Sequence, residues 1–544
     1  MTPAFTSSNL VSPVISMLLV IFYKHGILAQ SVEHLTFNQV VGGSNPPCLI
    51  YLKSRRTFLF FLFVGLLSDK NIIFAKECER VKKEYVKVEV RENKMGVMPV
   101  NKLLLNMSLP MMASMLVQAL YNIVDSIFVS RINEEALTAV SLAFPVQTLM
   151  IAVAGGTSVG INALLSRALG EKNQERVNRV ATNGAFLAVV GYVLFLMFGL
   201  FGTHFFFASQ TDATESGRQI LLYGEQYMRI CCICSIGIFT QCTFEKLLQS
   251  TGKTILTMVT QGVGAIINMI LDPILIFGYF GLPRMEVAGA ALATVIGQCV
   301  AGTLAVVLNQ KLNQEMHISF RKSPVSLRMI GEIYKIGIPS IVMQAIGSVM
   351  TYSMNRILMG FSATAAAVFG VYFKLQSFIF MPVFGLNNGL VPIIAYNYGA
   401  GKRSRMIKTI KLSIAYAVGL MLIGFTCFQV IPGPLLSLFE ASPEMLKIGI
   451  PALRIISYSF ILAGFCIVVG STFQALGKAM YSMFVSIARQ LLVLLPAAFI
   501  LAKVFGLGAV WFAFPIAELM SVTVSTFFFV RIYKNIISKV ADNV

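Results

Sequence analysis

Two carboxylates stand inside long apolar stretches of this chain, where a charged side chain is costly. Asp125 lies in an apolar run that begins near residue 103, and Asp272 lies in the sequence NMILDP, residues 268–273. A carboxylate at membrane depth is destabilising unless it is paired, hydrated or protonated. Both residues are therefore candidates for function. The alternative for each is a structural hydrogen bond to a neighbouring helix.

The segment NMILDP also predicts what such a site would bind. Asn268 and Asp272 are separated by about one helical turn, so a helix places both on the same face. Pro273 lacks the amide that would bond the carbonyl of Met269, which leaves an acceptor oxygen nearby. Carboxylate, carboxamide and carbonyl oxygens suit a small cation, and the carboxylate can instead take a proton. The segment therefore indicates a site for Na⁺ or H⁺.

Helices that cross a bilayer are needed to position these residues. The composition is 56% hydrophobic and 12% charged, which leaves too much apolar surface for a soluble core. From residue 103 onward, twelve apolar runs are each long enough to cross about 30 Å of hydrocarbon as a helix. These runs are 103–129, 137–165, 178–207, 220–248, 254–280, 287–309, 332–358, 363–396, 407–433, 447–475, 479–503 and 507–531.

The distribution of charge orients the expected helices. The net charge is +19, but the basic residues, among them Arg489, lie mainly in one set of loops and helix ends. The opposite set holds few basic residues and also carries acids such as Glu134, Glu135, Asp212, Glu215, Glu440 and Glu444. This asymmetry is the positive-inside pattern, so we expect both termini to be cytoplasmic. The same pattern argues against nucleic acid as a partner.

The chain also repeats itself. A shift of 229 residues pairs Pro110 with Pro339, Gln147 with Gln376, Gly156 with Gly385, Gly160 with Gly389, Gly170 with Gly399 and Arg176 with Arg405. The pattern predicts an all-α polytopic membrane protein of two six-helix lobes, residues 95–310 and 332–544, joined by a cytoplasmic loop at 311–331. Asp125 aligns with Met354 and Asp272 with Leu495, so both carboxylates belong to the first lobe only. Two repeated bundles of this kind are a transporter architecture.

Several motifs resemble one transporter family. SLPMMASMLVQALYNIVDSIFVS, ALTAVSLAFPVQTL, NMILDPILIFG and VAGAALATVIGQ are similar to the first half of a multidrug and toxic compound extrusion (MATE) exporter. YFKLQSFIFMPVFGLNNGLVPIIAYNYGAG and FPIAE are similar to the second half in the bacterial drug-exporter branch. The resemblance runs from about residue 95 to the end. It implies export of small amphipathic, often cationic compounds from a bacterial inner membrane, coupled to Na⁺ or H⁺ by alternating access.

The resemblance also implies roles for particular residues. The coupling site would consist of Asp125, Asn268, Asp272 and Thr294, and Pro110 would mark a bend in the first helix. Some family members use an acidic residue in the seventh or tenth helix. Here neither helix has a carboxylate at mid-depth, since Glu332 stands only at the entrance to the seventh. This departure places the coupling site in the N-terminal lobe.

Five further polar residues are candidates for substrate handling or gating: Gln118, Tyr121, Glu245, Lys374 and Glu518. Three of them have a structural alternative. Glu245 stands beside Lys246 and fits an interfacial ion pair, and Glu518 fits structural hydrogen bonding. Lys374 fits a side chain that extends to the interface or pairs within its own lobe.

Other functions compete with this reading. A lipid-linked oligosaccharide flippase has similar lobes but would favour a cationic cavity, and few basic residues lie at depth here. An enzyme is not expected, because the sequence has no HExxH, GxSxG or phosphate-binding loop. No cofactor is expected, and no metal beyond Na⁺ as the coupling ion. We expect the monomer to be functional.

The stretch AQSVEHLTFNQVVGGSNPP, residues 29–47, does not fit a membrane protein. It is polar and has no helical or strand period. A reverse translation of residues 29–46 can be written with the arms of a transfer RNA. The hypothesis is that a start codon has been assigned too far upstream. Residues 1–94 would then be a disordered extension without function, and the native chain would begin at Met95, at Met98 or slightly upstream.

Overall fold

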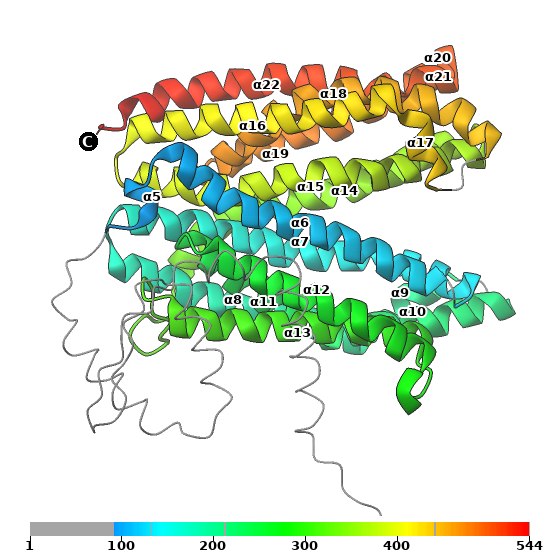
Figure 1. Cartoon of the computed structure of the whole chain (residues 1–544). Coiled ribbons are helices and arrows are strands. Elements are labelled where there is room, and N and C mark those ends of the chain that lie inside the picture. The colour runs from blue at the N-terminus through cyan, green and yellow to red at the C-terminus, as the bar shows by residue number, and fades with distance from the viewer. Residues whose placement is uncertain (1–91, 131, 212–213, 440–441, 543–544) are drawn as a thin grey trace, which may run out of the picture. The chain divides into compact units, whose positions relative to one another are not determined.

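The computed structural model describes residues 92–130, 132–211, 214–439 and 442–542 (Figure 1). The hypothesis about a transfer-RNA-like extension falls outside these residues, except for Glu92, Asn93 and Lys94. Those three residues do make contacts: Glu92 pairs with Lys402, and Asn93 caps a short helix. The described part is built from helices joined by short connections.

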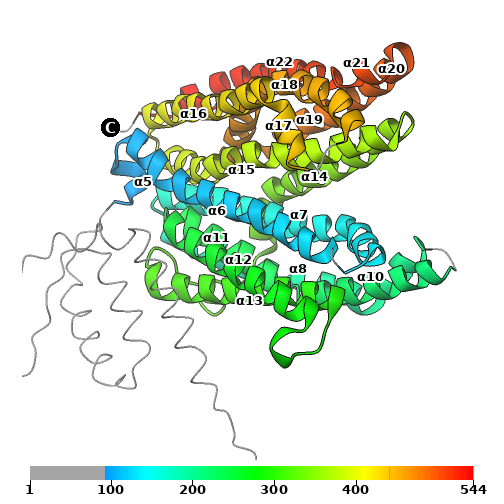
Figure 2. The ribbon, with the colours of Figure 1, turned by 45° about the vertical axis from the view of Figure 1, so that its right-hand side comes forward.

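In the described part of the first half, the α-helices are α5 (Lys94–Val97), α6 (Val100–Ser130), α7 (Glu134–Gly170), α8 (Gln174–Phe201), α9 (Thr203–Ala208), α10 (Glu215–Ile233), α11 (Ile236–Ser250), α12 (Thr254–Phe277) and α13 (Glu286–Leu312). The second half contains α14 (Leu327–Met359), α15 (Ala363–Gly399), α16 (Arg403–Val430), α17 (Pro432–Ser437), α18 (Pro443–Ala475), α19 (Ala479–Ile487), a π-helical segment (Ala488–Leu494), α20 (Leu495–Phe505), α21 (Leu507–Val510) and α22 (Ala513–Asn535). Figure 2 shows the helices of the two halves lying roughly parallel.

The expectation of twelve spans is confirmed. Among the described residues, eleven helices are long and apolar enough to cross a membrane, and the bent pair α10–α11 brings the number to as many as twelve. The run expected at 220–248 is therefore broken, because α10 and α11 meet at 44°. The break lies at Cys234 and Ser235, and Gly237 is the second residue of α11. A side chain at Gly237 would press against Cys299 of α13, so this glycine permits close contact between α11 and α13.

Polar side chains and glycine set several helix ends. The side chain of Asn133 accepts a hydrogen bond from Ala136 N at the start of α7, and Asn173 does the same for Arg176 N at the start of α8. Gly278 ends α12 with a positive φ of 75°, a conformation that glycine adopts at little cost. Pro110 and Pro273 lie inside α6 and α12, and both helices continue through them.

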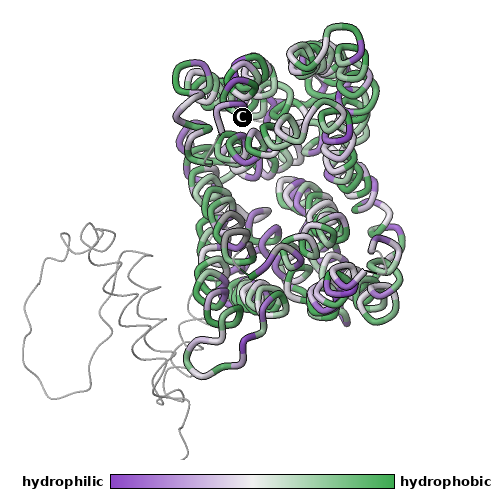
Figure 3. The backbone as a smooth tube through the Cα atoms, turned by 90° about the vertical axis from the view of Figure 1, so that its right-hand side faces the viewer, coloured by the Kyte–Doolittle hydropathy of each residue, from purple (hydrophilic) through white to green (hydrophobic). Residues whose placement is uncertain are grey.

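The helices form two lobes, α6–α13 and α14–α22, which Figure 3 shows as two groups seen along the helix axes. Helix α6 joins them. Leu103, Leu104 and Met107, near its start, belong to the apolar core of the second half. Further along, α6 packs on α12 of its own lobe. The first helix therefore contacts both lobes.

The glycines of the internal repeat lie where the lobes meet. On α7, a side chain at Gly156 would overlap Ile341 of α14, and one at Gly160 would overlap the carbonyl of Ile333. The equivalent glycines of α15 face α6 in the same way: Gly385 is against Met112, and Gly389 is against Ser108. The repeat thus marks a seam in which α7 packs on α14 and α15 packs on α6.

At one end of this seam the two lobes touch through their main chains. Gly170, the last residue of α7, lies against the carbonyl of Tyr396. Gly399, the last residue of α15, lies against the carbonyl of Arg167. We call this the α7/α15 end. The guanidinium of Arg167 also stacks on Tyr398, 4.7 Å from its ring centroid.

Candidate functional site

Three helices of the first lobe bring the expected coupling residues together. Asp125 comes from α6, Asn268 and Asp272 from α12, and Thr294 from α13. Helix α12 packs on both α6 and α13. It approaches α13 closely because two glycines face each other: a Cβ at Gly297 would lie 2.8 Å from the carbonyl oxygen of Gly264.

Asn268 is the hydrogen-bonding centre of this group. Its side chain is 3% exposed. In the amide orientation that satisfies both of its groups, the nitrogen donates to Asp272 Oδ2 over 3.3 Å. The oxygen then accepts from Thr294 Oγ1 and from Thr294 N, each over 3.1 Å. Asn268, Asp272 and Thr294 therefore form one connected polar cluster between α12 and α13.

The two carboxylates each keep a free acceptor. Asp272 is fully buried, and its Oδ1 has no hydrogen-bond partner among the described residues. The Oδ1 atom of Asp125 is likewise buried without a described partner. Asp125 is on α6, which packs on α12, the helix that carries Asp272. Buried acceptors without partners are unfavourable, and a small cation or a proton placed between these oxygens would satisfy them.

Other candidates line a cavity of about 210 Å³ beside this cluster. Its walls include Asn268 and Thr294, together with Gln118 and Tyr121 of α6. Gln118 also forms a hydrogen bond with Tyr121, one turn before Asp125. The cavity therefore connects the coupling cluster with two of the residues expected to handle substrate or gating.

Glu245 lies in the wall of the same cavity, and its surroundings differ from those expected. Its side chain is 4% exposed. Thr260 Oγ1 donates to it over 2.9 Å, Gln261 Nε2 over 2.6 Å and Gln241 Nε2 over 3.1 Å. Three neutral donors from α11 and α12 therefore hold the carboxylate. These partners were not predicted from the sequence, although Gln241 and Glu245 are four residues apart and share a helix face.

The expected ion pair between Glu245 and Lys246 is absent from the described part of the chain, so that interpretation was wrong. Neighbouring residues on a helix point in different directions and do not face each other. Lys246 Nζ instead donates to Gln249 Oε1 over 2.8 Å and to Asn388 Oδ1 over 2.7 Å. Since Asn388 is on α15, this lysine joins the two lobes.

Glu518 is paired within the second lobe. Arg489 Nη1 donates to its Oε2 over 3.1 Å, while the other carboxylate oxygen is buried without a described partner. The charge pattern placed Arg489 among loop and end residues, and that assignment was wrong. Arg489 lies in the π-helical segment of a membrane-spanning element, and π-helical turns often occur at functional sites.

Lys374 lies apart from the cluster. It is exposed on α15, and its Nζ is 5.9 Å from the ring centroid of Phe439. This contact agrees with a side chain that extends towards the interface. Within the described ranges, no group of three or more His, Cys, Asp and Glu side chains has an arrangement that would hold a metal ion.

The repeat and the spans agree with the comparison to known proteins. The sequence profile of the MatE family matches residues 110–274 and 339–500, which together exceed half of the chain. The chain belongs to this family. The resemblance to MATE exporters is thereby confirmed, and so is the fold class of two helical lobes with twelve spans.

Individual relatives match this chain over most of their length. The multidrug export protein MepA of Staphylococcus haemolyticus is 28% identical over 418 residues, which are 77% of this chain and 90% of that protein. An FAD transporter of Shewanella oneidensis is 26% identical over 427 residues, or 78% of this chain and 92% of that protein. An outward-facing multidrug resistance MATE transporter has the same fold. It gives a TM-score of 0.78 at 23% identity and covers 83% of this chain and 100% of its own.

Proposed function

We propose that this MATE protein exports small amphipathic, often cationic compounds in exchange for Na⁺ or H⁺ by alternating access. The single observation that carries the proposal is the pair of buried carboxylate oxygens at Asp125 and Asp272, which have no described partner. Family membership and the name of the MepA relative support drug export.

The coupling cation is the second substrate of the exchange. Asp125, Asn268, Asp272 and Thr294 would receive it, with the carbonyl of Met269 freed by Pro273 as a further acceptor. When the cluster is empty, the two carboxylates repel each other across α6 and α12. When a cation or proton occupies it, the repulsion is removed and the two helices can approach.

The position of α6 explains how binding of a cation in the first lobe can affect the second lobe. Its first part packs in the core of the second lobe, and Asp125 is in its later part. Pro110 lies between these parts and removes one helical hydrogen bond, so bending there is less costly. Movement of α6 at Pro110 would narrow the cavity beside Gln118 and Tyr121 and expel the exported compound.

The driving force is adequate for such an exchange. One positive charge that enters down about 100 mV releases about 2.3 kcal/mol. Since about 1.4 kcal/mol corresponds to a factor of ten in concentration, this energy supports a gradient of tens-fold for an uncharged compound. A chemical gradient of the coupling ion would add to it.

The test is gradient-driven efflux from cells that lack their own pumps. The full chain is expressed, a cationic dye is loaded, and Na⁺ and pH gradients are imposed separately. Asp125→Asn and Asp272→Asn should each abolish export while the protein stays in the membrane. Asp542→Asn is the matched control, because this carboxylate lies outside the spans and bonds Ser404.

The outcomes separate the candidate functions. Export that persists in Asp125→Asn or Asp272→Asn would remove that residue from the coupling role. If the wild-type chain exports nothing under either gradient, lipid-linked precursors are measured next, because their accumulation in a deletion strain would indicate the flippase. FAD is included among the tested compounds because one relative is named for its transport.

A further inference from the structure

Two arginines related by the internal repeat lie at the α7/α15 end: Arg176 contacts the second lobe, and Arg405 contacts the segment that precedes α6. Arg176 and Arg405 occupy equivalent positions in the first turns of α8 and α16. Neither belongs to the coupling cluster or to the cavity beside it. Their contacts form two clasps, which we name the Arg176 clasp and the Arg405 clasp.

The Arg176 clasp joins side chains. Arg176 Nη2 donates to Glu332 Oε2 over 2.9 Å, and Glu332 is on α14, the first helix of the second lobe. Arg176 Nη1 donates to Glu171 Oε2 over 3.1 Å, which holds the guanidinium at the end of α7. The side chains of Arg176 and Glu332 are 28% and 34% exposed. A pair with that exposure is weak enough to open and reform.

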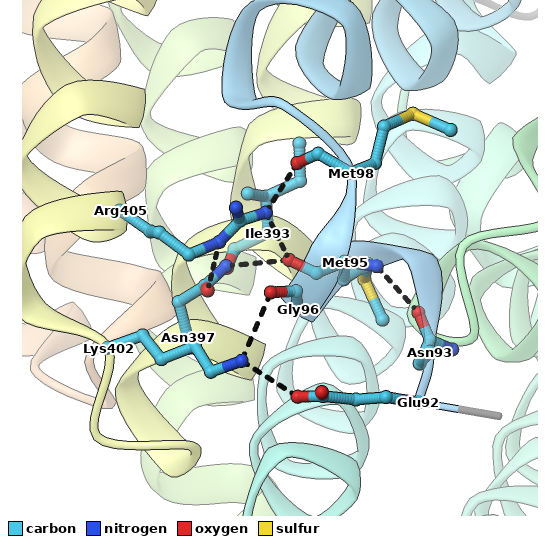
Figure 4. A network of polar contacts seen from close by, with 9 residues as sticks. All are labelled: Glu92, Asn93, Met95, Gly96, Met98, Ile393, Asn397, Lys402 and Arg405. Atoms are coloured by element: carbon cyan, nitrogen blue, oxygen red, sulfur yellow. Dashed lines mark hydrogen bonds and ion pairs between the residues drawn. The ribbon is translucent and has the colours of Figure 1, made fainter. Parts of the chain in front are cut away.

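The Arg405 clasp uses main-chain acceptors. Arg405 Nη2 donates to the carbonyl of Met95 over 3.1 Å and to that of Met98 over 2.7 Å. Its Nε donates to Asn397 Oδ1 over 3.1 Å, and Asn397 Nδ2 donates to the same Met95 carbonyl over 3.1 Å. Figure 4 shows these bonds converging on the short helix α5.

Neighbouring contacts fasten the same segment to both lobes. Lys402 Nζ donates to Glu92 Oε1 over 2.8 Å and to the Gly96 carbonyl over 3.1 Å (Figure 4). On the other side, Asn93 Nδ2 donates to the Thr251 carbonyl of the first lobe over 3.2 Å. Met95 is fully buried. The segment therefore bridges the lobes directly before α6 begins.

The two clasps are equivalent by position, although their acceptors differ. In each half, an arginine that follows the second long helix binds the chain at the entrance to the first long helix of the other half. Both act at the end where Gly170 and Gly399 bring the main chains of the lobes into contact. Separation of the lobes at that end would break the Arg176–Glu332 contact and would strain the segment that Arg405 and Asn93 hold between the lobes.

We propose that Arg176 and Arg405 are positioning residues for transport. The two clasps hold the α7/α15 end of the lobes closed and release when that end opens. The proposal rests on the exchange between two access states proposed above. The new element is that Arg176 and Arg405, which are outside the coupling cluster, stabilise the access state in which the α7/α15 end is closed.

The experiment measures the separation of the lobes in the full chain in lipid. Genetically encoded spin labels replace Lys172 in the first lobe and Lys408 in the second, both of which are exposed. Arg176→Ala and Arg405→Ala should each shift the distance distribution towards longer values and lower the export rate. The double variant should shift it further.

Each variant has a matched control in the same helix turn. Arg179 pairs with Glu175 of its own helix, and Arg403 bonds Ser538 and Tyr533 of its own lobe. Arg179→Ala and Arg403→Ala remove the same charge without crossing the seam, so they should keep the wild-type distances. Arg405→Lys, in case the alanine variant fails to fold, should still lengthen the distance, because an ammonium cannot span three acceptors as a guanidinium does.

Unchanged distances in Arg176→Ala and Arg405→Ala, or equal shifts in the two control variants, would overturn the proposal. The distance measurement needs no transported substrate. A wild-type chain that fails to export would therefore contradict the proposed function and leave the clasps to be judged by the distances alone.

Discussion

At the scale of single residues, hydrogen bonding distinguishes the buried acids of this protein. Asp272 and Glu245 are both buried in the first lobe, yet Asp272 keeps an oxygen without a described partner and Glu245 receives three donors. A buried carboxylate that is already satisfied has less need of a cation than one that is not. This difference favours Asp272 over Glu245 as a coupling residue.

The three donors to Glu245 predict a stability effect. Glu245→Ala would leave Gln261 and Gln241 without their acceptor, whereas Thr260 Oγ1 keeps the Thr257 carbonyl at 2.8 Å. Each unsatisfied buried donor costs about 1–3 kcal/mol. We expect a lower midpoint of thermal unfolding for the purified protein in detergent. Glu245→Gln, which keeps an acceptor oxygen, should lose much less.

The control for this measurement is Glu225→Gln. Glu225 is a glutamate of the same lobe that pairs with His204 and Arg229 outside the cavity. An unfolding midpoint of Glu245→Ala equal to that of Glu225→Gln would show that Gln261 and Gln241 find other partners.

At the scale of elements, α5 is the smallest helix with a large set of contacts. Asn93 caps it, Asn397 and Arg405 bind its carbonyls, and Lys402 joins it to Glu92. Propensity alone would not stabilise a helix of four residues. Its conformation therefore depends on tertiary contacts with the second lobe.

These contacts predict a pH dependence for α5. The hydrogen bond and charge of Lys402 lower the pKa of Glu92 below its ordinary value of 4.5. The pairing therefore stabilises the docked segment above that ordinary value, and the stabilisation is lost as pH falls through the lowered pKa. Hydrogen exchange of the Lys94–Met98 amides, corrected for intrinsic rates, should show protection that declines on acidification.

Glu92→Gln is the variant that tests the cause. It should show weaker protection at neutral pH and little further change on acidification, because the titrating group is gone. The same decline with pH in Glu92→Gln as in the wild type would assign the effect to another group.

At the scale of the whole molecule, the seam of repeated glycines determines how closely the lobes approach. Gly170 and Gly399 face carbonyls of the opposite lobe, while Gly370 and Gly419 have open space where a side chain would stand. Glycine is therefore required for close packing at the seam, whereas away from the seam a larger side chain would fit.

Alanine substitutions should separate these roles. Gly170→Ala and Gly399→Ala would force the lobes apart at the α7/α15 end, so we expect reduced export and a lower unfolding midpoint. Gly370→Ala and Gly419→Ala add a better helix former in open space and should be neutral or slightly stabilising, by up to about 1 kcal/mol. Equal effects of the two sets on export would contradict the role of the seam.

The sequence by itself determined the elements and their order. Apolar length predicted the spans because the thickness of a bilayer fixes how long a spanning helix must be. Helical period placed Asn268 and Asp272 on one face, and the repeat located the glycines that became the seam. The cost of burying charge singled out Asp125 and Asp272 without any knowledge of their neighbours.

Only the tertiary structure decided which groups meet. The charge pattern placed Arg489 among loop and end residues, and adjacency in the chain paired Glu245 with Lys246. Both predictions were wrong because sequence shows where a charge is costly and not which partner satisfies it. Arg489 meets Glu518 across 29 residues, and Arg405 meets the Met95 carbonyl across 310. Such pairs form because helix packing brings distant segments together, and main-chain acceptors such as Met95 and Met98 leave no side-chain signal in the sequence.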